Sequence, residues 1–134
     1  MPNIELALVI CNEGEDCRKI VGSVLKCGMS PICCSKLEEA RKLLAQDIFR
    51  VVFCQDSLVD GDFRAVLRAV KNTSPRTPVI VLSRVADWDS YLKALSLGVF
   101  DYIVCPANHA EAQRIIWLAL ADTMDYEKAA YAAV

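Results

Sequence analysis

Short apolar segments alternate along the whole chain with segments whose apolar residues recur at helical spacing. The apolar segments lie at about residues 4–10, 31–34, 51–54, 78–82 and 102–104. They are short and mostly rich in β-branched and aromatic residues, as is typical of strands buried on both faces of a sheet. Such strands in strict alternation with amphipathic helices indicate a parallel sheet covered on both faces. The alternation therefore predicts an α/β fold with a doubly wound, five-stranded parallel sheet.

The helical segments show apolar residues three and four positions apart, the spacing that forms one face of a helix. They lie at about residues 17–25, 37–44, 63–70, 92–95 and 108–120. Gly28 and Gly98 follow two of these segments and predict helix ends there. Because the sequence contains no internal repeat or linker, we expect one domain over residues 1–134, with a core at 4–122 and a helical extension or tail at 123–134.

Composition excludes several classes of protein. A net charge of −2 and a pI near 5.4 argue against a nucleic-acid-binding surface. No apolar run is long enough to span a membrane, and the first residues lack a signal-peptide pattern, so we expect a cytoplasmic protein. The seven cysteines form no Cys-x-x-Cys pair, and His109 is the single histidine. This leaves no zinc pattern, so we expect reduced thiols that fill space in the core, and no metal or other cofactor.

The carboxyl ends of parallel strands meet at one edge of a sheet, where open α/β folds form their ligand crevice. The segments after the predicted strands bring polar residues and cysteines to this edge: Cys11, Asn12, Glu13, Gln55, Asp56, Ser57, Ser83, Arg84 and Cys105. No glycine-rich phosphate loop is present. His109, in the first turn of the last predicted helix, has no evident partners for nucleophilic catalysis. These loops therefore do not indicate an enzyme.

Over residues 4–122 the sequence resembles the receiver domains of bacterial two-component response regulators. The resemblance rests on an ordered set of segments: Leu8-Val9-Ile10 before a polar turn, Val51-Val52-Phe53-Cys54 before Leu58-x-Asp60-Gly61, Thr77-Pro78-Val79-Ile80-Val81-Leu82-Ser83, Ala94-Leu95-x-x-Gly98, and Asp101-Tyr102 before Cys105-Pro106. The intervals of 28 residues from Gln55 to Ser83 and of 22 from Ser83 to Cys105 also agree. The resemblance implies the (βα)5 flavodoxin-like receiver fold and a role in signal transduction.

As the resemblance implies, receivers accept a phosphoryl group on an aspartate that ends the third strand. An acidic pair that holds Mg²⁺, a threonine or serine, and a lysine assist this transfer. In this chain Gln55 stands at the aspartate, and Cys11 and Asn12 stand at the acidic pair. Cys105 stands at the lysine, and only Ser83 keeps its type. Since an amide lacks a carboxylate nucleophile, we interpret the chain as a pseudo-receiver, a non-enzymatic signalling domain that works without phosphorylation.

Two alternatives remain open for this site. In the first, Asp56 is the acceptor of an ordinary Mg²⁺-dependent receiver. Against it, the spacing to the downstream Asp-Gly turn fits Gln55, and side-chain alternation along the strand points Asp56 away from Gln55. In the second, a disulfide between Cys11 and Cys105 makes the domain a redox-responsive binding module.

Arg84 follows Ser83 directly, at a position that is usually small in the receiver family. An arginine there has two possible uses. In one, its side chain covers the mouth of the pocket or hydrogen-bonds toward Gln55, Asp56 or Glu13. In the other, it points into solvent.

The resemblance also predicts a surface for protein partners, because receivers signal through their fourth helix, fifth strand and fifth helix. The exposed aromatic and aliphatic residues expected there are Trp88, Tyr91, Phe100, Ile115, Trp117 and Leu118. The last helix has a separate inward stripe formed by Ala112, Ile116, Ala119 and Leu120. Tyr102 keeps the family's aromatic switch position. The expected partners are a kinase, an output protein or a second copy in a homodimer, and neither nucleic acid nor membrane.

Overall fold

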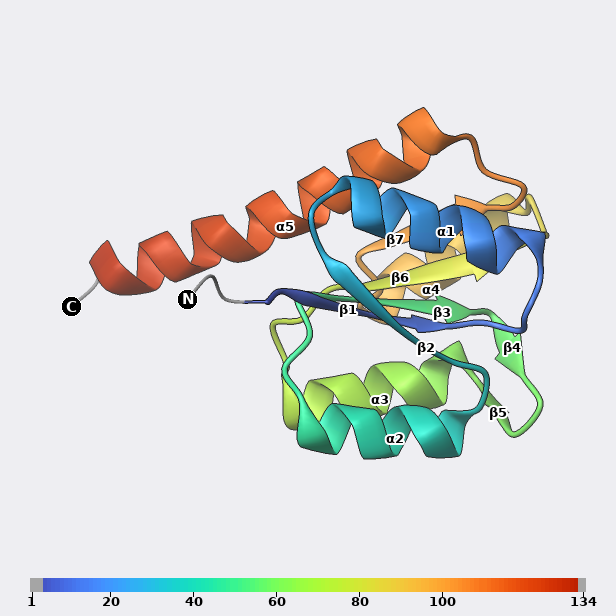
Figure 1. Cartoon of the computed structure of the whole chain (residues 1–134), viewed down its shortest axis with the longest axis horizontal. Helices are drawn as coiled ribbons and strands as arrows, with labels where there is room; N and C mark the ends of the chain where they lie inside the picture. Colours follow the sequence, from blue (N-terminus) through green and yellow to red (C-terminus); the bar gives the residue numbers. More distant parts are fainter. Residues whose placement is uncertain (1–3, 133–134) are drawn as a thin grey trace.

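A parallel sheet lies at the centre of the computed structural model (Figure 1), which describes the backbone of residues 4–132 and the side chains of residues 4–122. Its strands within that range are β1 (Leu6–Ile10), β2 (Ser30–Cys34), β3 (Val51–Gln55), β6 (Val79–Ser83) and β7 (Asp101–Val104). They lie in the order β2-β1-β3-β6-β7, and every neighbouring pair is parallel. The strand ends differ from the predicted ends by one or two residues.

Helices connect the strands and cover both faces of the sheet (Figure 1): α1 (Glu15–Lys26), α2 (Leu37–Gln46), α3 (Phe63–Thr73), α4 (Trp88–Ser96) and α5 (His109–Ala132). Helices α1 and α5 pack on one face, and α2, α3 and α4 pack on the other. The predicted doubly wound α/β fold is thereby confirmed. Among the described residues, no helix is both long enough and apolar enough to cross a bilayer.

The central strands supply side chains to both faces of the sheet. Val9, Phe53 and Ile80 face α1 and α5. Leu8 and Val52, one position away along their strands, face the other helix layer. All five side chains are fully buried. Burial of one such side chain stabilises a fold by about 1.5–3 kcal/mol relative to exposure, so the apolar runs hold both helix layers in place.

Glycine ends two of the helices, as predicted. Gly28 follows α1 with a φ of +81°, and Gly98 follows α4 with a φ of +106°. Side chains with a Cβ rarely adopt these left-handed conformations, whereas glycine adopts them without steric cost. Each glycine therefore lets the chain leave its helix and enter the next strand.

The turn after β3 forms a small antiparallel hairpin of β4 (Ser57–Leu58) and β5 (Gly61–Asp62) where the sequence predicted a turn. The Asp60 carboxylate accepts hydrogen bonds from the backbone N–H groups of Leu37 (2.7 Å) and Glu38 (3.1 Å) at the start of α2. A Cβ on Gly61 would lie 2.8 Å from Leu37 Cδ2, so a larger residue there would require the Leu37 side chain to shift. The Asp-Gly pair thus attaches the hairpin to α2.

Helix α5 continues beyond the sheet, and its last turns extend away from the other elements (Figure 1). The predicted inward stripe is buried: Ala112, Ile116, Ala119 and Leu120. Ile115 is buried with them at 2% exposure, because it packs among the residues between α5, α1 and the sheet. The prediction of Ile115 as an interface residue is therefore wrong.

Candidate functional site

The carboxyl ends of β3, β6 and β7 enclose a small pocket of about 130 Å³. Its lining consists of Gln55, Asp56, Leu82, Ser83, Arg84, Val85 and Cys105. Five of the residues proposed for the site from sequence alone lie in this lining. Cys11 and Asn12 reach the same edge from the end of β1, where the backbone N–H of Asn12 bonds Gln55. Glu13 lies exposed in the same loop.

Gln55 is the last residue of β3, and its side chain has a structural partner. Its Oε1 accepts a hydrogen bond of 2.8 Å from the backbone N–H of Asn12. This bond fastens the loop after β1 to the end of β3. The amide oxygen of Gln55 is therefore engaged inside the protein.

Asp56 also lies in the pocket. Its Oδ1 accepts from the backbone N–H of Ser57 at 2.9 Å, and its Oδ2 accepts from the Ser83 hydroxyl at 2.7 Å. The Ser83 hydroxyl oxygen in turn accepts from the backbone N–H of Val85 at 3.0 Å. Strand β3 ends at Gln55, so the alternation of side chains does not continue to Asp56. Asp56 therefore lies in the pocket, as the sequence placed it, with its carboxylate bonded to Ser83 while the Gln55 amide bonds Asn12.

Arg84 bonds an acidic residue that the sequence did not single out. Its Nε donates to Asp16 Oδ2 at 3.0 Å, and its Nη2 lies 2.9 Å from the same oxygen. No hydrogen bond joins Arg84 to Gln55, Asp56 or Glu13 among the described residues. Asp16 stands in the first turn of α1, where acidic residues complement the helix dipole, and that position was the available signal. The pair joins the loop after β6 to α1 at the rim of the pocket.

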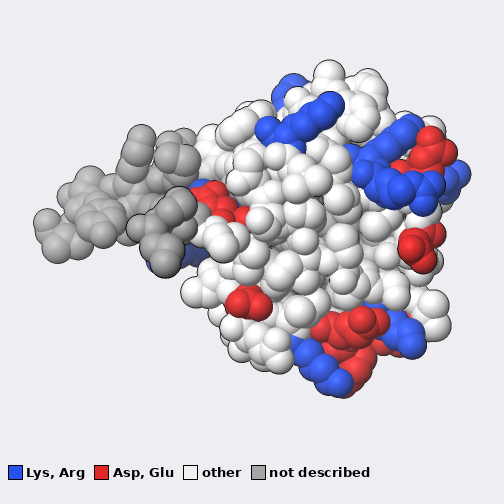
Figure 2. Space-filling view, in the orientation of Figure 1, with Lys and Arg blue, Asp and Glu red and all other residues white. Residues whose placement is uncertain are grey.

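The visible face of the molecule places basic and acidic groups next to each other at this rim. In Figure 2, blue and red side chains gather at the edge of the sheet where α1 begins, and much of the middle of the face is uncharged. Ion pairs of α1 belong to this region: Arg84 with Asp16, and Lys19 with Glu15. The rim thus combines charges of both signs, and no large field of one sign forms on this side.

The side chains at the edge do not fit a Mg²⁺ ion, which prefers several carboxylate, carbonyl or water oxygens. Burial raises the pKa of the Cys11 thiol to about 12, and burial raises that of Cys105 to about 11. Both thiols are therefore neutral at physiological pH, and Cys105 cannot supply the positive charge of a lysine. Within residues 4–122, no group of three His, Cys, Asp or Glu side chains is arranged to hold a metal ion.

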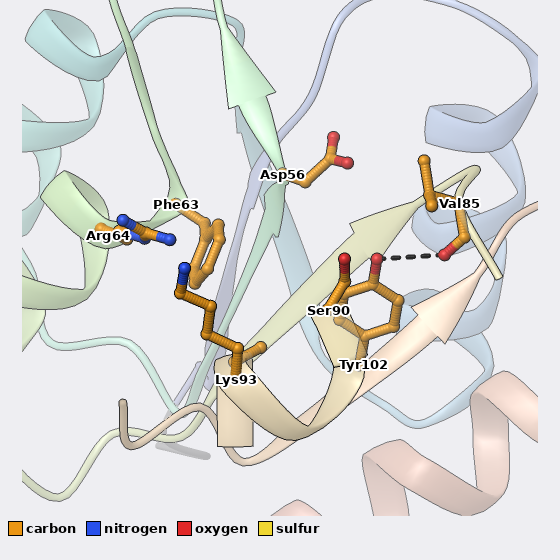
Figure 3. Close-up of a pocket in the computed structure, with 8 residues that line it drawn as sticks. Asp56, Phe63, Arg64, Val85, Ser90, Lys93 and Tyr102 are labelled. Atoms are coloured by element: carbon orange, nitrogen blue, oxygen red, sulfur yellow. Dashed lines mark hydrogen bonds between the residues drawn. The ribbon is translucent and has the colours of Figure 1, made fainter. Parts of the chain in front are cut away.

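A second cavity of about 240 Å³ extends from Asp56 to Tyr102 (Figure 3). Tyr102 is buried, and its hydroxyl donates to the backbone carbonyl of Val85 at 3.1 Å. Arg64 and Lys93 lie together on one side of this cavity, away from the Asp56 carboxylate. The cavity thus extends from the site to α4, and neither cation lies against the Asp56 carboxylate.

The predicted partner surface is partly exposed as expected. Trp88 is 69% exposed, Trp117 is 55% and Leu118 is 47%. Tyr91 is half-buried: it stacks on Trp88 with ring centroids 5.4 Å apart, and it meets Tyr102 edge-on at 6.0 Å. A shallow pocket of about 250 Å³ lies beside this aromatic series, lined by Ala86, Asp87, Trp88, Tyr91, Tyr102 and Val104.

Two further predicted residues serve the packing of the domain. Phe100 is half-buried against the core between α1, α5 and the sheet. His109, for which the sequence shows no partners for nucleophilic catalysis, is exposed, and its Nδ1 lies 3.4 Å from the hydroxyl of the fully buried Ser23. This contact joins the start of α5 to α1.

The relatives of known name are response regulators, and no protein-family model matches the chain. A putative NtrX-like response regulator of Rickettsia bellii is 29% identical over 107 residues, which cover 76% of this chain and 22% of that protein. The transcriptional regulatory protein ZraR of Escherichia coli is 24% identical over 121 residues, covering 90% of this chain and 27% of the relative. The chain thus spans about a quarter or less of the length of these relatives.

Solved structures with the same fold are receiver domains. The beryllofluoride-activated receiver domain of DrrB has a TM-score of 0.78 at 23% identity and covers 89% of this chain and 99% of its own. A CheY-like receiver domain of Methanospirillum hungatei has a TM-score of 0.82 at 14% identity and covers 92% and 99%. The beryllofluoride-activated NtrC4 receiver domain dimer has a TM-score of 0.81 at 23% identity and covers 88% and 98%. The fold is that of receiver domains, and the relatives' names support the response-regulator receiver family.

Proposed function

We propose that this chain is a receiver-like signalling domain that acts through protein contact and does not accept a phosphoryl group. The observation that carries the proposal is Gln55 at the acceptor position, with its amide oxygen bonded to the backbone N–H of Asn12. The likeness to response regulators supports the signalling class. The replaced residues around Gln55 support the loss of phosphorylation.

The charges around the pocket support the same reading. Phosphoryl transfer requires positive charge to neutralise the equatorial oxygens of the transferred group. The thiol of Cys105 stands where the family has a lysine, and its raised pKa keeps it neutral. Arg84 is directed to Asp16 by its ion pair. Neither residue therefore offers a cation to a phosphoryl group on β3.

The surface for signalling is the one formed by α4, β7 and α5. Trp88, Tyr91 and Tyr102 form a continuous aromatic series from solvent to the core, and Tyr102 is held inward by Val85. This arrangement needs no phosphoryl group. Val104 of β7 lines a shallow pocket with this series, and Trp117 and Leu118 are further exposed apolar residues on α5. Because such anchors dominate protein interfaces, the partner is a protein, either an output protein or kinase, or a second copy. The NtrC4 receiver domain was solved as a dimer, which supports the second-copy form.

A second candidate is an ordinary receiver that is phosphorylated on Asp56. The contact that favours it is the 2.7 Å hydrogen bond from the Ser83 hydroxyl to Asp56 Oδ2, which places the acidic residue next to the serine of the pocket. Both carboxylate oxygens already accept hydrogen bonds. The neighbouring cations, Arg64 and Lys93, point to the other side of the adjoining cavity (Figure 3).

The decisive experiment incubates the protein with acetyl phosphate and Mg²⁺ and measures its intact mass. We expect no added phosphoryl group in the wild type or in Asp56→Asn, while a phosphorylatable receiver treated in parallel gains one. The same samples with beryllofluoride and Mg²⁺ should leave the fluorescence of Trp88 and Trp117 unchanged. A Mg²⁺-dependent mass gain that is lost in Asp56→Asn would establish the second candidate instead.

A further inference from the structure

Four of the seven cysteines gather at the carboxyl edge of the sheet, on the face covered by α1. Cys11 follows β1, Cys17 lies in α1 and Cys105 follows β7, and all three belong to the apolar layer on that face. Cys33 lies in β2 and pairs in register with Val9, whose side chain points to the same layer. Residues directly paired on neighbouring parallel strands share a face, so the Cys33 thiol also lies under α1.

Cys17 is the centre of this group. Its thiol lies close enough to those of Cys11 and Cys33 to help raise the pKa of both. The three sulfurs therefore form a series that runs from the buried Cys11 through the half-buried Cys17 to the exposed Cys33. Cys105 also contributes to the raised pKa of the Cys11 thiol, but no hydrogen bond joins these two thiols among the described residues.

Cys11 and Cys33 differ in their exposure and in their place in the sheet, and both differences favour Cys33 as the disulfide partner of Cys17. Cys11 is 5% exposed at the end of the central strand β1. Cys33 is exposed and lies on β2, an edge strand of the sheet. A covalent bond at an edge strand requires less rearrangement of the core than a bond inside it. Oxidants in solution also reach Cys33 directly.

We propose that Cys17 and Cys33 form an oxidisable dithiol that closes to a disulfide between α1 and β2. This site is different from the Cys11–Cys105 pair considered from the sequence, and it leaves the Gln55 pocket without a covalent link. It does not depend on whether the domain accepts a phosphoryl group. Asp16, the partner of Arg84, directly precedes Cys17, so the bond acts on the helix turn that carries the rim ion pair.

The oxidant is a peroxide. The thiolate of one cysteine attacks an oxygen of hydrogen peroxide, the O–O bond breaks, and a sulfenic acid and one water form after proton transfer. The second thiol then displaces the hydroxyl group from the sulfenic sulfur, which forms the S–S bond and releases a second water. In total, two thiols and one peroxide give one disulfide and two waters. A dithiol reductant reverses the bond by thiol–disulfide exchange.

The test treats the full chain with hydrogen peroxide, blocks the remaining thiols, and maps the disulfide by mass spectrometry. Trypsin separates residues 1–18 from residues 27–36, and cleavage after Glu13 and Glu15 separates Cys11 from Cys17. We expect a cross-link between the fragment that contains Cys17 and residues 27–36, and its disappearance on treatment with dithiothreitol.

Variants identify the sulfurs. Cys17→Ser and Cys33→Ser should each abolish the cross-link. Cys34→Ser is the matched control, because Cys34 follows Cys33 in the same strand but faces the opposite helix layer, and the cross-link should persist in it. Circular dichroism confirms that each variant is folded. A Cys11–Cys17 or Cys11–Cys105 linkage, a disulfide only between two copies of the chain, or no disulfide after peroxide would each overturn the proposal.

Discussion

Side chains at the pocket edge bond other groups of the protein, whereas those on the α4–β7–α5 surface are exposed to solvent. At the edge, Gln55, Asp56, Ser83 and Arg84 each bond another group of the same protein. On the surface, Trp88 and Trp117 are mostly exposed. Polar groups that bond internally have little left to offer a ligand, whereas exposed aromatic area remains available for burial against a partner. The difference agrees with our proposal that the domain acts through contacts on this surface and without phosphorylation at the edge.

The clearest contrast between a buried and an exposed side chain lies within α5, where Ile115 is buried and Trp117 is exposed. Ile115→Glu places an unpaired carboxylate in the core and should lower the free energy of unfolding by about 4 kcal/mol or more. Urea unfolding monitored by circular dichroism measures this loss. If Ile115→Glu is as stable as the wild type, the inward face of α5 has been assigned wrongly.

Trp117→Glu should leave the free energy of unfolding within about 0.5 kcal/mol of the wild type, because the side chain is mostly exposed. It should weaken self-association or partner binding by about tenfold or more, since a central aromatic anchor contributes more than about 1.4 kcal/mol. A sedimentation-velocity series over protein concentration measures the association.

Lys42→Glu is the matched control for this variant, because it reverses a charge on the exposed side of α2, across the sheet from α5. It should leave association unchanged. A wild type that sediments as a monomer at all concentrations, as Trp117→Glu does, would count against the homodimer.

The contribution of the Asp60 carboxylate in the β4–β5 hairpin to stability can be tested through its dependence on pH. Hydrogen bonds from the N–H groups of Leu37 and Glu38 lower the pKa of the Asp60 carboxyl. A folded-state pKa below the unfolded value stabilises the fold above about pH 4, and this contribution is lost as the pH falls through the folded pKa. Asp60→Ala should therefore lower the thermal midpoint at pH 7 and have little effect at pH 2.

Differential scanning calorimetry across this pH range measures the effect. Asp122→Ala, at an exposed position of α5, is the control and should change the midpoint little at either pH. An Asp60→Ala effect that is equal at pH 7 and pH 2 would show that the carboxylate charge is not what holds α2.

The smallest effect is expected at the rim of the pocket. Arg84 is 73% exposed, and exposed ion pairs typically contribute about 0.2–1 kcal/mol. Arg84→Ala should therefore reduce stability by no more than this amount at low salt, and by less at high salt because the charges are screened. Urea unfolding at two ionic strengths measures both values. A loss above 2 kcal/mol that persists at high salt would mean that Arg84 packs as a core residue.

Much of the fold was predictable because it depends on local spacing. Alternating apolar segments predicted the strands and helices, and Gly28 and Gly98 predicted helix ends at which the structure shows positive φ. Position along the chain also predicted which residues reach the pocket edge. Ile115 was misassigned because the buried stripe of α5 is wider than the four residues first counted, and a spacing pattern does not give the width of a stripe.

Contacts between distant segments were not predictable in the same way. Asp56 bonds Ser83, and Arg84 bonds Asp16, 68 residues away in sequence. His109 meets Ser23 across 86 residues, and Cys17 meets Cys11 and Cys33. Each of these contacts depends on where the loops and helix ends lie once the layers have packed, and no periodic pattern records that placement.

The sequence by itself determined the α/β architecture and the amide side chain of Gln55 at the end of β3, because strand periodicity, helix amphipathicity and residue identity are local properties of the chain. Only the tertiary structure decided what the remaining groups do. It directs the Gln55 amide to Asn12, Arg84 to Asp16, and the Cys17 thiol to Cys11 and Cys33. The physical reason is that hydrogen bonds and ion pairs act over a few ångströms, so packing between distant segments selects the partner of each polar side chain.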